Sequence, residues 1–143
     1  MNRSARFSFV RAAGAPCLAV AVLVAGLMAA TGTQAQGTGI KRTPVLKADV
    51  SAPNAEAVVM RVELEPGVKA GRHTHPGDEI SYVLEGEGDL LIDGEPPRRV
   101  KAGDAFVIPA GKIHDAHNAG SGTMRLVGVY VVEKGKPLAT PAK

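Results

Sequence analysis

The sequence lacks the features of several common protein classes. Its 143 residues include one cysteine, Cys17, so the chain forms no internal disulfide bond and must rely on a hydrophobic core, with or without metal. Lysine and arginine are scattered among acidic residues and form no basic stripe, which argues against a nucleic-acid partner. No apolar run reaches the roughly 20 residues of a membrane-spanning helix. The length predicts one domain.

Residues 1–35 differ in composition from the rest of the chain. Three arginines and no acidic residue accompany an apolar run of 13 residues at 18–30. With small residues at Thr33 and Ala35, this order is typical of a secretory signal peptide cleaved after Ala35. We therefore expect an exported protein, periplasmic or secreted, without a stable membrane anchor. The remainder holds 14 Lys and Arg against 14 Asp and Glu.

The remainder divides into three segments by composition. Residues 36–43 are rich in Gly and Thr and predict a flexible lead-in, whereas residues 134–143 contain two prolines and predict a flexible tail. The folded body is expected at residues 44–133.

This body contains short strand-type runs and no helical period. In residues 58–64 apolar and charged side chains alternate, so Met60, Val62 and Leu64 should face the core. Many short strands without helices predict an all-β fold, an antiparallel sandwich or barrel. Further strand material is expected at 80–84, 89–92, 106–108 and 124–132.

The four histidines all lie between positions 73 and 117. His73 and His75 are two residues apart and would share one face of a strand, so one ion can bind both. Glu79 and His114 each follow a turn that could bring them to the same ion. Taken singly, each of these residues also fits an ordinary surface position. Together they predict one divalent metal ion (Fe, Mn, Ni, Cu or Zn) with coordination positions left open for substrate, water or dioxygen.

The spacing around these residues resembles the two motifs of the cupins. The first motif places glycines on either side of His-x-His and Glu, and it is met by Gly67, His73, His75, Glu79 and Gly86. The second is met by Gly103, Pro109, Gly111, His114 and Asn118, after an interval of 16 residues. The resemblance implies a cupin double-stranded β-helix, or jelly-roll barrel. In such a barrel His73, His75, Glu79 and His114 would bind the metal. It also implies a homodimer, with residues 43–50 supplying an edge strand.

The resemblance leaves the reaction open, because cupins include dioxygenases, lyases, isomerases and binding modules. Our leading hypothesis is a metal-dependent oxidoreductase of dioxygenase type that acts on a small organic molecule, with Glu79 taking up the substrate proton. The alternatives are a non-catalytic module that binds a small molecule or metal, and a non-redox lyase or isomerase.

Other residues receive structural interpretations. We expect Asn118 to cap a turn and His117 to point away from His114. Tyr82 and Tyr130 could each offer a phenol to a ligand, although packing in the wall is the more common use.

Overall fold

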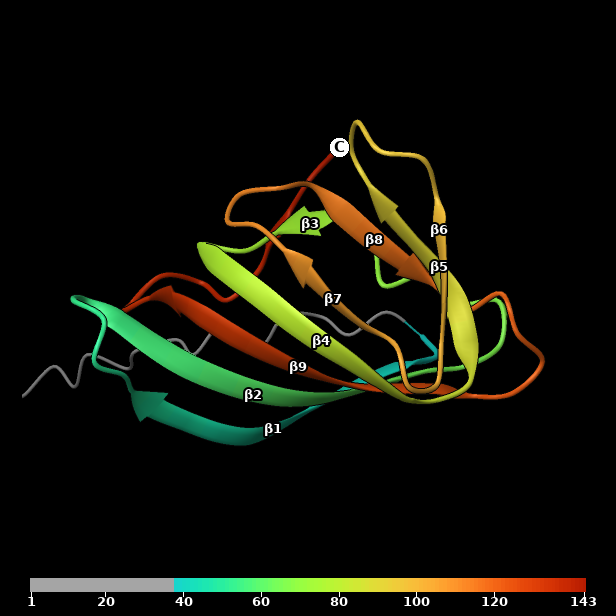
Figure 1. Ribbon diagram of the computed structural model, residues 1–143, viewed down its shortest axis with the longest axis horizontal. Coiled ribbons are helices and arrows are strands. Elements are labelled where there is room, and N and C mark those ends of the chain that lie inside the picture. Colours follow the sequence, from blue (N-terminus) through green and yellow to red (C-terminus); the bar gives the residue numbers. More distant parts are fainter. Residues whose placement is uncertain (1–37) are drawn as a thin grey trace, which may run out of the picture. The chain divides into compact units, whose positions relative to one another are not determined.

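The computed structural model describes residues 38–143, which form strands and turns without helices (Figure 1). The predicted signal peptide lies outside these residues. Within the described part of the chain, no helix has the length and hydropathy needed to cross a membrane.

The strands form two antiparallel sheets that face each other. The five-stranded sheet with the order β1-β2-β9-β4-β7 is made of β1 (Ile40–Asp49), β2 (Ala55–Leu64), β9 (Met124–Glu133), β4 (Gly77–Glu85) and β7 (Ala105–Ile108). We call it the long-strand sheet. The second sheet, with the order β10-β3-β8-β5-β6, is made of β10 (Thr140–Pro141), β3 (His73–Thr74), β8 (His114–His117), β5 (Glu87–Ile92) and β6 (Arg98–Lys101). We call it the short-strand sheet. The expected all-β fold of antiparallel strands is confirmed.

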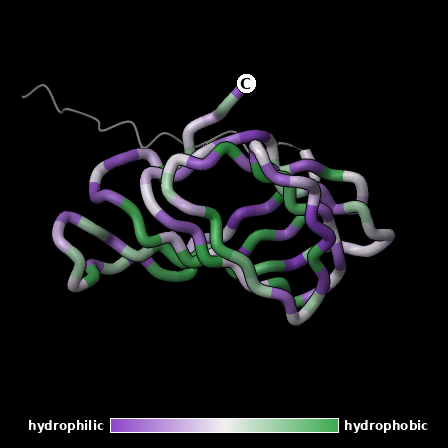
Figure 2. Tube along the Cα trace, turned by 45° about the horizontal axis from the view of Figure 1, so that its top comes forward, coloured by the Kyte–Doolittle hydropathy of each residue, from purple (hydrophilic) through white to green (hydrophobic). Residues whose placement is uncertain are grey.

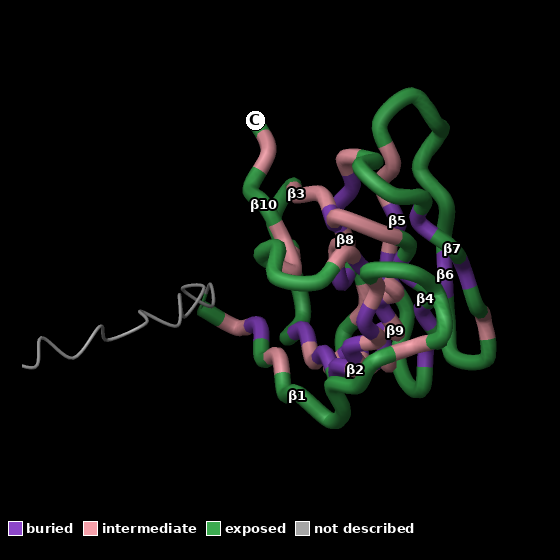
Figure 3. Tube along the Cα trace, turned by 90° about the vertical axis from the view of Figure 1, so that its left-hand side faces the viewer, coloured by how far each residue is buried: buried purple, intermediate pink, exposed green. Residues whose placement is uncertain are grey.

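The core lies between the sheets and follows the alternation of the strands. Met60, Val62 and Leu64 are buried while Arg61 is exposed, as the sequence predicts. Buried and less buried residues also alternate along β4 and β9 (Figure 3). Hydrophobic residues lie mainly along the strands, and hydrophilic residues are common in the connecting loops (Figure 2).

Both ends of the described chain are more ordered than expected. Strand β1 begins at Ile40, so residues 40–43 of the predicted lead-in belong to the edge of the long-strand sheet. In the predicted tail, residues 140–141 pair with β3, and the Ala142 amide donates to the Arg72 carbonyl at 2.9 Å. Composition missed these segments because edge strands tolerate Thr and Pro and depend on a neighbouring strand being available.

Tight turns connect the strands at the glycines of the two motifs. Gly67, Gly86, Gly103 and Gly111 all have positive φ angles, between 73° and 93°, a region that favours glycine. At Gly86 a Cβ atom would also lie 2.9 Å from the Cα of Met124. These residues therefore serve the scaffold, as expected.

Asn118 holds the loop that follows β8. Its side chain is fully buried, and its Nδ2 donates to the carbonyls of Leu64 and Gly122, each at 2.8 Å. Its Oδ1 accepts from the Gly120 amide at 3.0 Å. The predicted capping role is confirmed, and the bond to Leu64 extends it to a second strand.

Candidate metal centre

The structure brings all four predicted ligands together at one end of the barrel. One ligand atom from each of His73, His75, Glu79 and His114 lies within 4.8 Å of every other. His73 in β3 pairs directly with His114 in β8, and His75 follows β3 by one residue. Glu79 comes from β4 of the facing sheet. The cluster can therefore hold one metal ion between the sheets.

The chain crosses from one sheet to the other between His75 and Glu79. The sequence suggests that a turn swings Glu79 back over the histidine face, whereas Glu79 lies inside β4, paired with Tyr130 of β9. Gly77 begins β4 so close to β9 that a Cβ atom would lie 2.1 Å from the Val131 carbonyl oxygen. Only glycine fits this approach, which sets where Glu79 enters the barrel.

Each of the three imidazoles uses its Nδ1 atom in a hydrogen bond to a backbone carbonyl. The pairs are His73 with Gly71 at 2.5 Å, His75 with Leu138 at 2.6 Å, and His114 with Lys112 at 3.0 Å. Because a carbonyl only accepts, Nδ1 must carry the proton, which leaves the Nε2 lone pair of a neutral ring free to bind a metal. The backbone thus selects the tautomer that a metal ligand needs.

The atoms that face the centre of the cluster would make more favourable contacts with a cation than they make with one another. The Oε2 of Glu79 lies 3.0 Å from Nε2 of His75 and 3.2 Å from Nε2 of His114, while its Oε1 accepts from the Ser81 hydroxyl at 2.6 Å. His75 Nε2 is buried and has no hydrogen-bond partner among the described residues. A buried nitrogen without a partner is costly. A divalent ion would satisfy it, so these residues fit the metal that the sequence predicts.

Burial and neighbouring charges set the protonation of the cluster. Burial lowers the pKa of His73 to about 4, so this ring is neutral at pH 7. Burial alone would raise the pKa of Glu79, but contacts with His114, His75 and Ser81 outweigh it and hold the pKa below its usual range. Burial opposes protonation of His114 as well, yet Glu79 and the Lys112 carbonyl leave its pKa raised. Glu79 is therefore the anion that offsets a cation.

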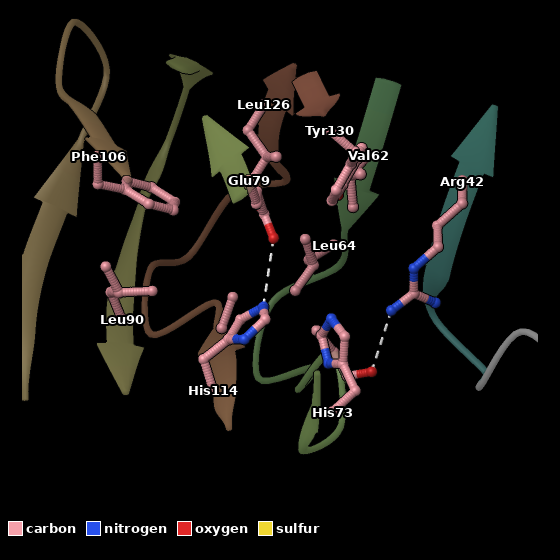
Figure 4. Close-up of a pocket in the computed structure, with 12 residues that line it drawn as sticks. Arg42, Val62, Leu64, His73, Glu79, Leu90, Phe106, His114, Leu126 and Tyr130 are labelled. Carbon is pink, nitrogen blue, oxygen red and sulfur yellow. Dashed lines mark hydrogen bonds and ion pairs between the residues drawn. The ribbon is translucent and has the colours of Figure 1, made fainter. Parts of the chain in front are cut away.

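A small cavity of about 40 Å³ lies beside the cluster (Figure 4). One water molecule needs about 10–15 Å³ of cavity volume. The cavity therefore admits only a ligand of a few non-hydrogen atoms. Its polar lining consists of Arg42, His73, Glu79, His114 and Tyr130. Its apolar lining consists of Val62, Leu64, Ala70, Leu90, Phe106, Ala116 and Leu126.

Sequence reasoning assigned no site role to Arg42 or Ser81 and placed Tyr130 in the wall. Ser81 had a detectable signal, because a residue two after Glu79 on a strand shares its face. Tyr130 is buried against the His75 ring, with centroids 4.7 Å apart, and also lines the cavity. Burial raises the pKa of Tyr130, so it keeps a neutral hydroxyl.

Tyr82 is half exposed and lines no part of the cavity. The expectation that Tyr82 packs in the wall is therefore wrong.

His117 is the one histidine outside the cluster. Its Nδ1 lies 3.8 Å from Oδ2 of Asp89, and its ring is partly exposed. It therefore points away from the centre, as its spacing from His114 predicts.

Comparison with known proteins identifies the family. The family model of the cupin domain matches residues 60–132. The chain is 45% identical over 42 residues to the dimethylsulfoniopropionate lyase of Ruegeria pomeroyi, covering 29% of this chain and 21% of the lyase. It is 32% identical over 80 residues to the oxalate-binding protein of Thermotoga maritima, covering 55% of this chain and 65% of that protein. The chain thus spans less than two thirds of either relative.

Solved structures agree with this assignment. A conserved double-stranded β-helix protein from Klebsiella pneumoniae superposes with a TM-score of 0.59 and 25% identity, over 75% of this chain and 90% of that one. The residues matched by the family model contain all four members of the cluster, which are His73, His75, Glu79 and His114. The chain belongs to the cupin domain family.

Proposed function

We propose that this cupin is a metal-dependent enzyme that acts on a small organic molecule, and that its reaction is an oxidation of dioxygenase type. The observation that carries the proposal is the centre itself: three imidazole nitrogens and one carboxylate converge beside a cavity. Four protein ligands would leave positions on a bound divalent ion open to a substrate and to dioxygen.

The residues around the cavity have separate tasks in such a reaction. A bound divalent ion would supply Lewis acidity toward an oxygen atom of the substrate. Oε2 of Glu79 lies next to Nε2 of His75 and of His114 and would accept the substrate proton, while Ser81 fixes the other carboxylate oxygen. Leu64, Leu90 and Phe106 line the cavity with apolar surface, which limits access of water.

The test is to measure the metal bound by the purified protein and then its consumption of dioxygen. Protein loaded anaerobically with Fe(II) should hold one ion per chain and consume dioxygen when small enolic compounds are added. Stoichiometric metal without uptake, for Fe(II), Mn(II), Ni(II) and Cu(II) alike, would overturn the dioxygenase assignment and leave the metal centre intact.

A second candidate is a non-redox role, either as a lyase or as a module that binds a small molecule. The similarity to a lyase and to an oxalate-binding protein favours it. This role predicts that Zn(II) supports the function as well as Fe(II), because no electron is transferred. Ligand binding to the Zn(II) form, measured by calorimetry, with no dioxygen uptake in the Fe(II) form would select this candidate.

We also propose that the protein is exported and that residues 1–35 are removed. The arginine-containing start and the short apolar run support this proposal. The measurement is N-terminal sequencing of the protein recovered from the periplasmic or extracellular fraction. A mature start near Gln36 is expected, whereas an intact Met1 in the cytoplasmic fraction would contradict export.

We further propose that two copies pair through β1. This strand forms the edge of the long-strand sheet, and an edge strand presents unpaired backbone groups to a second copy. Size-exclusion chromatography with light scattering should give twice the mass of the mature chain. A monomer at high protein concentration would contradict the pairing.

A further inference from the structure

Arg42 places a positive charge on the inner face of the barrel, where neighbouring positions are apolar. It pairs with Val62 of β2, which pairs with Leu126 of β9. Val62 and Leu126 are buried and line the cavity together with Arg42. Residues opposite one another across antiparallel strands point to the same side of a sheet, so the Arg42 side chain points toward the metal centre (Figure 4).

The surroundings hold this guanidinium in place. Its Nη2 donates to the Ala70 carbonyl at 3.1 Å, which ties it to the loop before His73. Glu79, Tyr130 and Asp115 are close enough to influence its charge, and burial lowers the pKa of Arg42. An arginine remains protonated under such conditions. A charge turned inward is expensive in an apolar wall, and it is a functional candidate where it lines a cavity.

The charges that line the cavity do not balance once an ion is bound. A divalent ion contributes two positive charges and Arg42 one, while Glu79 and the buried Asp115 near Arg42 contribute one negative charge each, so the sum stays positive. The rest of the lining adds no charge, because His73 and His114 donate Nδ1–H to backbone carbonyls and would bind the ion as neutral rings, and the other side chains are Tyr130 and apolar groups. The excess positive charge favours an anionic ligand, and the cavity admits only a small one.

We propose that the substrate of this site is a small carboxylate of two or three carbons, whose carboxylate group binds Arg42 while a second oxygen faces the three histidines. The guanidinium presents paired N–H donors that match the two oxygens of a carboxylate. The inference rests on the proposed metal-dependent function and adds the chemical class of the ligand. Arg42 lies outside the residues matched by the family model, so the inference comes from the geometry of this chain.

The experiment measures the binding of acetate, glycolate, glyoxylate and oxalate to the Zn(II)-loaded protein by calorimetry, with ethylene glycol as a neutral probe. The unaltered protein should bind at least one of the anions and bind ethylene glycol more weakly. Arg42→Met should weaken anion binding at least about tenfold and leave ethylene glycol unaffected. Arg42→Lys keeps the charge but loses the paired donors, so its loss should be smaller.

Arg61→Met is the matched control. Arg61 carries the same charge on β2, adjacent in sequence to Val62, but is exposed on the opposite face of the sheet. Its substitution should change anion affinity by less than about twofold, because solvent screens a charge there. Metal content and melting temperature are recorded for every variant. If Arg42→Met fails to fold, Arg42→Lys carries the comparison.

The outcomes separate this inference from the metal function. If the protein binds no metal, the proposed metal-dependent function is wrong. A protein that binds metal but none of the four anions, or binds them equally well with Met or Lys at position 42, overturns the role of Arg42. Equal weakening of anions and ethylene glycol would also overturn it, because it would indicate a purely structural link between Arg42 and Ala70.

Discussion

The two sheets contribute to the centre in different ways. The short-strand sheet and the loops at its end supply three neutral imidazoles, and backbone carbonyls fix each ring through its Nδ1. The long-strand sheet supplies the charged groups Glu79 and Arg42 and the neutral hydroxyl of Tyr130. The difference suggests that one sheet fixes where an ion binds and the other fixes which ligand accompanies it.

Removing a ligand from the short-strand sheet should have the largest effect. His114→Ala deletes one of the four converging ligand atoms, so metal affinity should fall by more than about 100-fold. His117→Ala is the control, because His117 lies on the same strand and points away from the cluster. Metal retained after dialysis, measured by elemental analysis, gives the readout. Equal metal retention by the two variants would exclude His114 as a ligand.

Removing the negative charge supplied by the long-strand sheet should have a smaller effect on affinity. In Glu79→Gln an amide oxygen can still face the ion but carries no charge, so metal affinity should fall roughly 10- to 100-fold. At saturating metal, turnover should fall more than substrate binding if Glu79 accepts a proton. Glu95→Gln, in the exposed turn before β6, is the control. Full turnover of metal-loaded Glu79→Gln would remove the proton-accepting role.

The hydrogen bond behind Glu79 tests how far the long-strand sheet positions this ligand. Ser81→Ala removes the donor to Oε1, which lies 2.6 Å from the Ser81 hydroxyl in a fully buried setting. We expect about a tenfold loss of metal affinity. Ser121→Ala, at an exposed position, should bind metal normally. Unchanged affinity in both variants would show that β4 alone positions the carboxylate.

A substitution behind Tyr130 should spare the metal and affect stability. A Cβ atom at Gly128 would lie 2.7 Å from the Tyr130 hydroxyl oxygen, so Gly128→Ala must displace the ring and should lower the free energy of unfolding by about 1–3 kcal/mol. Gly122→Ala is the control, because nothing lies within 4 Å of its added Cβ. Urea unfolding measures the difference. Loss of metal from Gly128→Ala would contradict the proposal that the short-strand sheet fixes where the ion binds and the long-strand sheet fixes which ligand accompanies it.

The sequence identifies the four clustered residues, which remain candidate ligands, because their signals are local. His73 and His75 share a strand face through their spacing, and the glycines beside the motifs have the positive φ angles expected of tight turns. The same local patterns predict the buried and exposed sides of β2. Arg42 is different, because nothing near it in the sequence distinguishes it from a surface arginine on an exposed edge strand.

The predicted flexible segments show why local composition has limits. The tail supplies the Leu138 carbonyl, which accepts from His75 at 2.6 Å, and residues 140–141 extend the short-strand sheet. Neither contact has a signal in the tail itself. Each depends on a partner about 65 residues earlier in the chain, which no periodicity within the tail can identify.

The amino-acid sequence by itself determined the strands, the turn glycines and the residue types at the metal centre, because backbone propensity and short-range spacing act within a few residues. Only the tertiary structure decided that Glu79 faces the histidines from the opposite sheet, that the backbone fixes all three tautomers, and that Arg42 turns inward beside them. These features depend on strand register across the barrel, and register is set by the packing of the whole core.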